Sequence, residues 1–205
     1  LRFWRRAAAL AVFGGEVLVV GDEETALLRP RTTVLAVGAH DGVLPFEGND
    51  LPGVMSPRAA GWLLARGVVP GERILVVAEG AASLQAQSYA RAASAAGVGV
   101  RLLEGTTITR ASGGARVKAV VVEGPSGAAE EPADTLLVDA TRSPAYELLE
   151  QAGARLEHGA GGFVPAHAGD RAIAPGFFAI GECAGEPMDA AAYAAAASDV
   201  AARAG

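Results

Sequence analysis

Short apolar runs alternate with amphipathic stretches along the chain, and turn-forming residues separate them. Residues 33–37 (TVLAV) and 74–77 (ILVV) are apolar at every position, a pattern typical of parallel strands that are covered on both faces. Ser56 and Pro57 suit the N-cap and the first turn of a helix over 58–66, because serine caps a free amide and proline has none. The alternation of strands and helices predicts an α/β protein built in layers.

The remaining apolar runs are shorter, and turns that contain Gly, Ser or Pro bound them. Gly14 and Gly15 predict the turn of a hairpin whose second strand covers 16–20. The middle of the chain is expected to form a β-meander, and its end a short helix, a buried strand and an alanine-rich helix. These expected elements are a helix over 81–96, strands over 99–104, 106–110, 117–123 and 135–139, a helix over 146–152, a strand over 177–180 and a last helix from about Pro187.

Composition narrows the class of protein. Of the 205 residues 51% are apolar, which is enough for a packed core and argues against disorder. The net charge of −6 argues against a nucleic-acid surface, and no stretch has the pattern of a membrane span. Cys183 is the single cysteine, which excludes an internal disulfide and fits a reducing, cytoplasmic compartment. Because the chain begins at Leu1 and not at Met, we expect Leu1 to mark the end of a fragment.

Residues 175–185 (PGFFAIGECAG) carry the clearest candidate chemistry. An apolar strand ends here in Gly181, Glu182 and Gly185, just before the last helix. Gly181 permits close approach to the backbone, and ligands of open α/β sheets bind at the carboxyl ends of the strands. Glu182 could accept a hydrogen bond from a sugar or ribityl hydroxyl, and the helix N-terminus favours an electron-rich group. On spacing alone, a carboxylate that only caps the helix is an equally good interpretation.

The same segment resembles the second flavin motif of FAD-dependent oxidoreductases of the pyridine nucleotide-disulfide type. In that family a run of the form PG-(F/V)-(F/Y)-A-x-G-(D/E) holds the ribityl chain of FAD. Residues 34–39 (VLAVGA) resemble the motif that precedes the crossing into the nucleotide domain, and residues 138–154 resemble the return. The resemblance covers nearly the whole chain, and the order of its motifs makes it specific. It implies that FAD is contacted by Gly38, Ala39, Gly181, Glu182 and Gly185.

One branch of the family is closer still on residues 49–55 (NDLPGVM). It contains the FAD/NAD alpha subunits of heteromeric sarcosine oxidase, of proline and opine dehydrogenase, and of hydrogen cyanide synthase. The resemblance implies a partial two-dinucleotide-binding-domain fold with a β-meander. Residues 1–50 and 140–205 are then a partial FAD-binding domain, and residues 51–139 a shortened NAD(P)-binding-like domain. It also implies FAD as cofactor, a partner subunit, and electron transfer from the oxidation of an amine or amino acid.

Two departures from the family pattern bear on the cofactors. The first flavin motif, a GxGxxG segment for the FAD pyrophosphate, is expected upstream of Leu1. The nucleotide-domain motif reads AEGAAS at 78–83, where Ala78 stands in place of the first glycine. Gly80 is retained, and it is the glycine that lets the backbone approach a pyrophosphate. Ala78 and Gly80 remain candidates for cofactor binding, but the pattern favours a reduced domain that no longer binds NAD(P).

The other polar residues are weaker candidates. Glu104 or Arg101 could take the place of a ribose-reading side chain. Cys183 is expected to be a buried structural thiol, because a neighbouring carboxylate opposes ionisation of a thiol. No metal-ligand spacing occurs among the three histidines, His40, His158 and His167. We therefore assign no catalytic residue and no metal site. Two hypotheses remain: an enzyme subunit that uses FAD, and a cofactor-free structural or interaction module derived from the same family.

Overall fold

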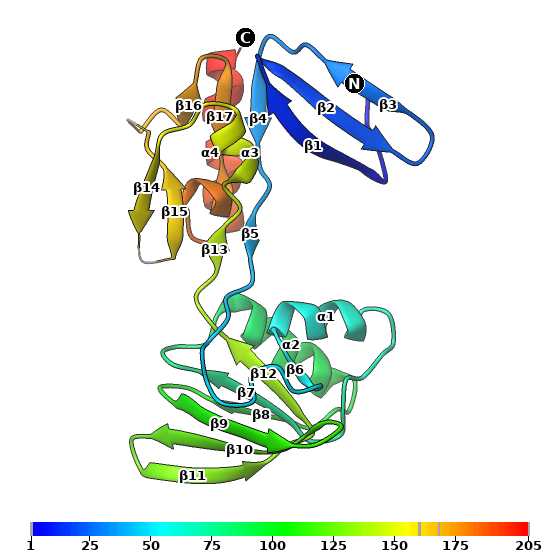
Figure 1. The fold of residues 1–205 in the computed structure, drawn as a ribbon, viewed down its shortest axis with the longest axis vertical. Helices are drawn as coiled ribbons and strands as arrows, with labels where there is room; N and C mark the ends of the chain where they lie inside the picture. Colours follow the sequence, from blue (N-terminus) through cyan, green and yellow to red (C-terminus); the bar gives the residue numbers. More distant parts are fainter. Residues whose placement is uncertain (1, 160, 168, 205) are drawn as a thin grey trace. The chain divides into compact units, whose positions relative to one another are not determined.

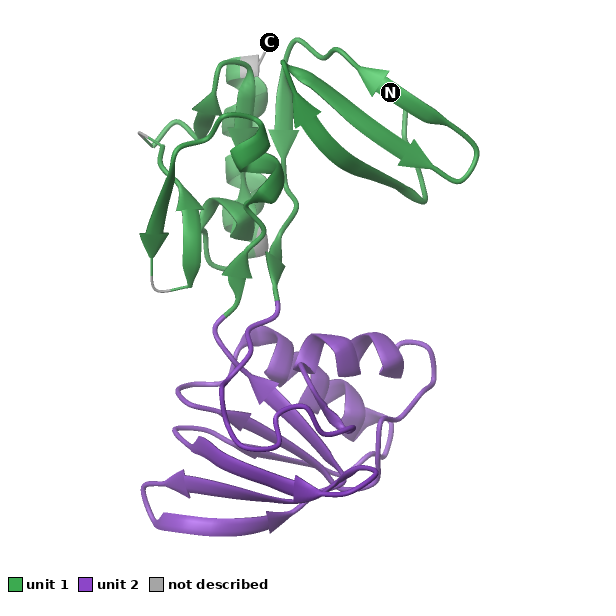
Figure 2. Cartoon of the chain, viewed as in Figure 1, with its two compact units in different colours: residues 1–40, 142–205 green, residues 41–141 purple. Residues whose placement is uncertain are grey.

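The structure is a computed structural model that describes residues 2–159, 161–167 and 169–204 (Figure 1). The chain divides into two compact units, coloured separately in Figure 2. Unit 1 comprises residues 1–40 and 142–205, and unit 2 comprises residues 41–141. Residues 41–50, which the sequence analysis grouped with the first segment, lie in unit 2, because Leu44 and Phe46 pack against its core.

Unit 2 has three layers around a parallel sheet (Figure 1). Alternate residues of its central strand β7 (Ile74–Ala78) point to opposite faces, so that Ile74 and Val76 pack against the helices while Leu75 and Val77 pack against the meander. All five residues of β7 are buried, which confirms the prediction of a covered strand. The other elements are β6 (Val54–Met55), β8 (Val100–Leu103) and β12 (Thr135–Asp139) of the sheet, helices α1 (Pro57–Leu64) and α2 (Leu84–Ala95), and strands β9 (Thr107–Gly113), β10 (Val117–Gly124) and β11 (Gly127–Pro132) of the meander.

Serine side chains cap both helices of unit 2. Ser56 Oγ accepts a hydrogen bond from the amide of Ala59 at 3.1 Å, as predicted. Ser83 Oγ accepts one from the amide of Ala86 at 3.2 Å, and α2 begins at Leu84. The second helix therefore starts three residues later than its expected start at residue 81, because the serine of the loop and not its alanines forms the cap.

The predicted meander is present, but the prediction of its third strand was wrong. Thr135–Asp139 joins the parallel sheet between β6 and β7, and β11 completes the meander in its place. β11 has the sequence GAAEEP and is mostly exposed at the edge, so it lacks the apolar alternation that marks a strand. The first four residues of β12 are buried, as expected of a strand covered on both faces.

Unit 1 gathers several small sheets around one core. Apolar residues of the first hairpin, Val12 and Val17, pack there with Leu35, Leu149 and Phe177. Figure 1 shows α3 and α4 alongside these strands. The elements are β1 (Ala7–Phe13), β2 (Glu16–Gly21) and β3 (Thr25–Leu28) in one antiparallel sheet, β4 (Thr33–Leu35), β17 (Phe177–Ala179) and β16 (Ala172–Ala174) in a second, the pairs β5 (Ala39–His40) with β13 (Ser143–Pro144) and β14 (Leu156–Gly159) with β15 (Gly162–Pro165), and helices α3 (Glu147–Gln151) and α4 (Ala190–Ala204).

Two predictions for unit 1 have opposite outcomes. The hairpin turn at Gly14 and Gly15 is confirmed, and both residues adopt positive φ (+57° and +81°), which only glycine adopts without strain. The prediction that residues 33–37 form a strand covered on both faces was wrong. Leu35 is buried in the core of unit 1, but Val34, whose side chain points to the opposite face of β4, is 44% exposed. An apolar run in the sequence therefore does not show that both faces of a strand are covered.

Candidate functional site

The carboxyl end of β17 turns sharply at the predicted flavin motif. β17 runs parallel to β4, and the amide of Ile180 continues the pairing by donating to the carbonyl of Leu35 at 3.0 Å. Gly181 then adopts a φ of +77° and begins a short 3-10 turn, Gly181–Ala184, which Gly185 ends with a φ of +79°. Both conformations favour glycine. The two glycines are thus required by the corner itself, and the corner places Glu182 at the end of a parallel strand pair.

Glu182 forms an ion pair that the sequence analysis missed. Arg142 Nη1 donates to Glu182 Oε1, and Arg142 Nη2 donates to the backbone carbonyl of Ala39 at 2.6 Å. The two side chains are only 14% and 19% exposed, so each charge depends on the other for its stabilisation. Arg142 lies in the return segment, forty residues before Glu182. The only sequence feature that could have suggested this pair is the presence of a cation, Arg142, within the return segment.

A groove of about 410 Å³ lies beside this ion pair, within unit 1. It is lined by Ala39, Arg142, Val164, Glu182, Gly185 and Met188, among others. Arg142 bonds Oε1 of Glu182, and no described residue donates a hydrogen bond to Oε2. That oxygen can therefore accept a hydrogen bond from a hydroxyl group in the groove, which is the role that the flavin motif implies.

The five residues expected to contact FAD all lie in unit 1. Ala39, Glu182 and Gly185 line the groove, and Gly181 forms the corner next to it. Gly38 adopts a φ of +76°, and its carbonyl accepts a hydrogen bond from the amide of Ala145. Their contact with a cofactor stays a prediction.

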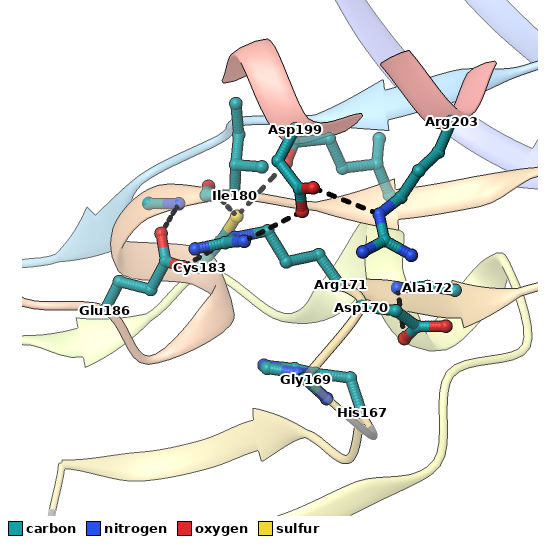
Figure 3. A network of polar contacts seen from close by, with 12 residues as sticks. His167, Gly169, Asp170, Arg171, Ala172, Ile180, Cys183, Glu186, Asp199 and Arg203 are labelled. Carbon is teal, nitrogen blue, oxygen red and sulfur yellow. Dashed lines mark hydrogen bonds and ion pairs between the residues drawn. The ribbon is translucent and has the colours of Figure 1, made fainter. Parts of the chain in front are cut away.

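A second arginine fixes the corner to the last helix, as Figure 3 shows. Arg171 Nε donates to Glu186 Oε1 at 2.9 Å, and Arg171 Nη1 donates to Asp199 Oδ2 of α4 at 3.3 Å. The other oxygen of Glu186 accepts from the amide of Gly181 at 2.8 Å. Arg171 adopts a φ of +61°, which costs about 1–2 kcal/mol in a residue other than glycine. The network offsets this strain and holds the turn in place.

Cys183 is buried behind the turn, which confirms a structural thiol. It is fully buried, and its Sγ contacts the carbonyl oxygens of Ile180 at 3.2 Å and Leu35 at 3.5 Å. Burial raises the pKa of the Cys183 thiol, so the thiol stays protonated at neutral pH. Burial, and then the charge of Glu182, also raise the pKa of Tyr193, whose ring lies beside Gly181. Neither group is set up as a nucleophile.

We expect Cys183 to react with a thiol reagent only when unit 1 opens. Because its folded-state pKa is raised, the thiol contributes to stability below its unfolded pKa, near 8.5, and this contribution is lost as the pH rises above that value. The rate of labelling by a disulfide reagent at pH 7.5 should be at least about 100-fold below that of the urea-unfolded chain. Comparable rates in the two states would show that the thiol is accessible.

The nucleotide-domain motif lies in unit 2, at the end of β7. Ala78 is the last, buried residue of β7, and Gly80 lies in the exposed loop that follows. The two residues proposed as ribose readers have other partners. Arg101 pairs with Glu131, and Glu104 Oε1 accepts from the amide of Ala82 at 2.7 Å. The motif therefore resembles a dinucleotide loop in sequence, but its polar neighbours are engaged within the protein.

The histidines do not form a site. His40 Nε2 pairs with Glu147 Oε1 at 2.9 Å. A backbone hydrogen bond lowers the pKa of Glu147, and the contact with His40 lowers it further. His158 packs edge-on against Phe163, and His167 Nδ1 accepts a weak bond from Gly169. Within residues 2–159, 161–167 and 169–204, no group of His, Cys, Asp and Glu side chains is arranged to hold a metal ion.

Solved structures show which proteins share this fold. L-proline dehydrogenase from P. horikoshii matches 86% of the chain at 26% identity with a TM-score of 0.69, and the match covers 36% of that protein. A FAD-dependent pyridine nucleotide-disulphide oxidoreductase from Desulfovibrio vulgaris matches 87% of the chain at 20% identity with a TM-score of 0.62, over 53% of its length. Thioredoxin reductase from Lactococcus lactis matches 95% of the chain at 16% identity and a TM-score of 0.64, over 71% of its length. The last two likenesses concern the fold alone.

The sequence itself matches one curated protein. Sarcosine oxidase subunit alpha of Corynebacterium sp. (strain P-1) is 35% identical over an alignment of 116 residues, and the match covers 46% of this chain and 12% of that protein. No protein-family model matches the chain.

The chain is similar in sequence to part of a sarcosine oxidase subunit and of an L-proline dehydrogenase, and it shares its fold with FAD-dependent oxidoreductases. This similarity agrees with the resemblance drawn from the motifs, and the layered α/β fold class is confirmed. The chain spans only about one eighth of the curated relative and about a third of the proline dehydrogenase. Among the residues that the structure describes, no helix has the length and apolar character to cross a membrane.

Proposed function

We propose that the chain is part of a FAD-dependent oxidoreductase subunit and binds FAD through the groove beside Glu182. The observation that carries this proposal is the Arg142–Glu182 pair at the end of the parallel strands β4 and β17. Both residues line a groove of about 410 Å³, and Arg142 bonds only one of the two carboxylate oxygens of Glu182. Ligands of α/β sheets bind at this end of the strands, which supports the assignment.

The residues of the groove would hold a flavin through different contacts. Oε2 of Glu182 would accept a hydrogen bond from a ribityl hydroxyl, while the ion pair with Arg142 holds the carboxylate in position beside the groove. Gly185 leaves little space for a larger residue, since an added Cβ would lie 3.0 Å from Val164. When bound, the flavin supplies the redox chemistry, and the protein supplies its position and electrostatic environment.

We further propose that the substrate is an amine or an amino acid and that a second protein subunit takes part. The support is the similarity to a sarcosine oxidase subunit and to an L-proline dehydrogenase, whose names specify substrates of this class. The subunit designation of the curated relative supports a hetero-oligomer. A cytoplasmic location fits the single, reduced cysteine of the sequence.

Binding of added FAD by the purified chain tests the site. We expect saturable binding, weaker than in a protein that also carries the GxGxxG segment for the pyrophosphate. Glu182→Gln should weaken FAD binding about tenfold, because a neutral amide oxygen is a weaker acceptor than a carboxylate. Glutamine keeps the shape of the side chain and an acceptor for Arg142. The measurement is a titration followed by quenching of flavin fluorescence.

Glu157→Gln is the matched control. Glu157 pairs with Arg155 on the surface of unit 1, where the carboxylate is 58% exposed, and does not line the groove. It should leave FAD affinity unchanged. A folded chain that binds no FAD would favour the cofactor-free module, and equal losses in the two variants would show that net charge, and not Glu182, controls binding.

A further inference from the structure

The N-terminal loop of α2 is occupied by carboxylates of the protein itself. The amide of Ser83 donates to Asp139 Oδ2 at 2.7 Å, and the Ser83 hydroxyl donates to Asp139 Oδ1 at 2.7 Å. The preceding amide, of Ala82, donates to Glu104 Oε1 at 2.7 Å. Asp139 ends β12 and Glu104 follows β8, so acids from the two strands that flank β7 meet at the loop that follows β7.

This loop is where a dinucleotide places its phosphates in folds of this type. The amides before the helix and the helix dipole bind the pyrophosphate, and a glycine lets it come close. In this chain, two of those amides already have anionic acceptors at short distance. Glu79 adds a third carboxylate to the loop itself, so an incoming pyrophosphate would meet like charges and lose the amides that should bind it.

The loop is also fixed in position by the backbone. The amide of Gly105 donates to the carbonyl of Gly80 at 3.0 Å, and the amide of Thr106 donates to the carbonyl of Ala78 at 3.1 Å. The segment after β8 therefore holds both predicted cofactor residues of unit 2, Ala78 and Gly80. Rearranging the loop around a ligand would break these bonds as well as the two carboxylate caps.

We propose that Asp139 and Glu104 are internal anions that replace the phosphates of a dinucleotide, so that unit 2 is closed to NAD(P). The fold retains the sheet, the loop and the helix of a dinucleotide site. The amides that would bind a phosphate instead bind carboxylates of the protein and stabilise unit 2. One consequence rests on the proposed function. The flavin would take its electrons from the substrate that it oxidises and not from a pyridine nucleotide bound in unit 2.

Titration of the full chain with NADH and with NADPH tests whether the loop is closed. We expect no saturable change in nucleotide fluorescence at dissociation constants below about 1 mM. The matched variant is Gly80→Leu, which would block the loop without strain, since Gly80 has no positive φ and an added Cβ there meets no atom within 4 Å. Binding that Gly80→Leu abolishes would overturn the proposal. Absence of binding, or binding that Gly80→Leu leaves unchanged, supports it, and neither result depends on whether FAD binds in unit 1.

Hydrogen exchange tests the role of Asp139 directly. Asp139→Ala removes both acceptors of Ser83, and we expect the amide of Ser83 to exchange at least about tenfold faster and the melting temperature to fall by about 5 °C. Glu79→Ala removes a charge from the same loop but no hydrogen-bond partner of Ser83, and it should change neither quantity. If the two variants behave alike, Asp139 is not a cap and the assignment fails.

Discussion

Replacing Arg142 by methionine is expected to lower the free energy of unfolding of unit 1 by about 3 kcal/mol. The substitution removes the cation beside Glu182 and leaves a carboxylate that is 81% buried without its ion-pair partner. Removing one partner of a mostly buried pair costs more than the pair contributes, because the remaining charge is only partly solvated at the groove. The carbonyl of Ala39 loses its donor as well. Urea unfolding followed by circular dichroism, with Cys183 labelling as the local reporter of unit 1, measures the effect.

Two further variants separate the ion pair from a general loss of charge. Arg155→Met removes an arginine that is 80% exposed and paired with Glu157, and it should cost less than about 0.5 kcal/mol. In the double variant Arg142→Met/Glu182→Leu no charge remains to be solvated, so part of the lost stability should return. A double variant that is less stable than Arg142→Met would contradict the assigned cause.

Leu137→Ala is expected to destabilise unit 2 by about 2–5 kcal/mol. Leu137 is fully buried in β12, in the cluster formed with the helices, where Ile74, Val76 and Tyr89 surround it. Its neighbour Leu136 faces the other cluster, so the helix side cannot be refilled from the same strand. Truncation therefore removes three carbons and leaves a cavity between sheet and helices. Urea unfolding of the full chain gives the change.

Leu84→Ala is the control for that measurement. Leu84 is the first residue of α2 and is 51% exposed, so its truncation should change stability by less than about 0.5 kcal/mol. Comparable losses from Leu84→Ala and Leu137→Ala would mean that the layer between sheet and helices is not the principal core of unit 2.

The sequence contained enough local information for most elements and for the corner of the candidate site. The apolar run 74–77 of β7, the serine cap of α1 and the glycines of the first hairpin are properties of short segments, and each was predicted. The edge strand β11 was missed because its side chains face solvent and carry no apolar pattern. Local pattern thus identifies strands that contribute to a core better than strands that extend an edge.

The sequence by itself determined the order of the elements, the glycine corner that holds Glu182, and the resemblance to flavoproteins. Only the tertiary structure decided which polar groups meet: Arg142 with Glu182, Arg171 with Glu186 and Asp199, and Asp139 with the amide of Ser83. These partners lie 15 to 56 residues apart. Backbone preferences and apolar periodicity act over a few residues, whereas a charge is neutralised by whichever group the fold brings within about 3 Å. The polar partners of a site are therefore set by the topology of the strands, which cannot be read from a single sequence.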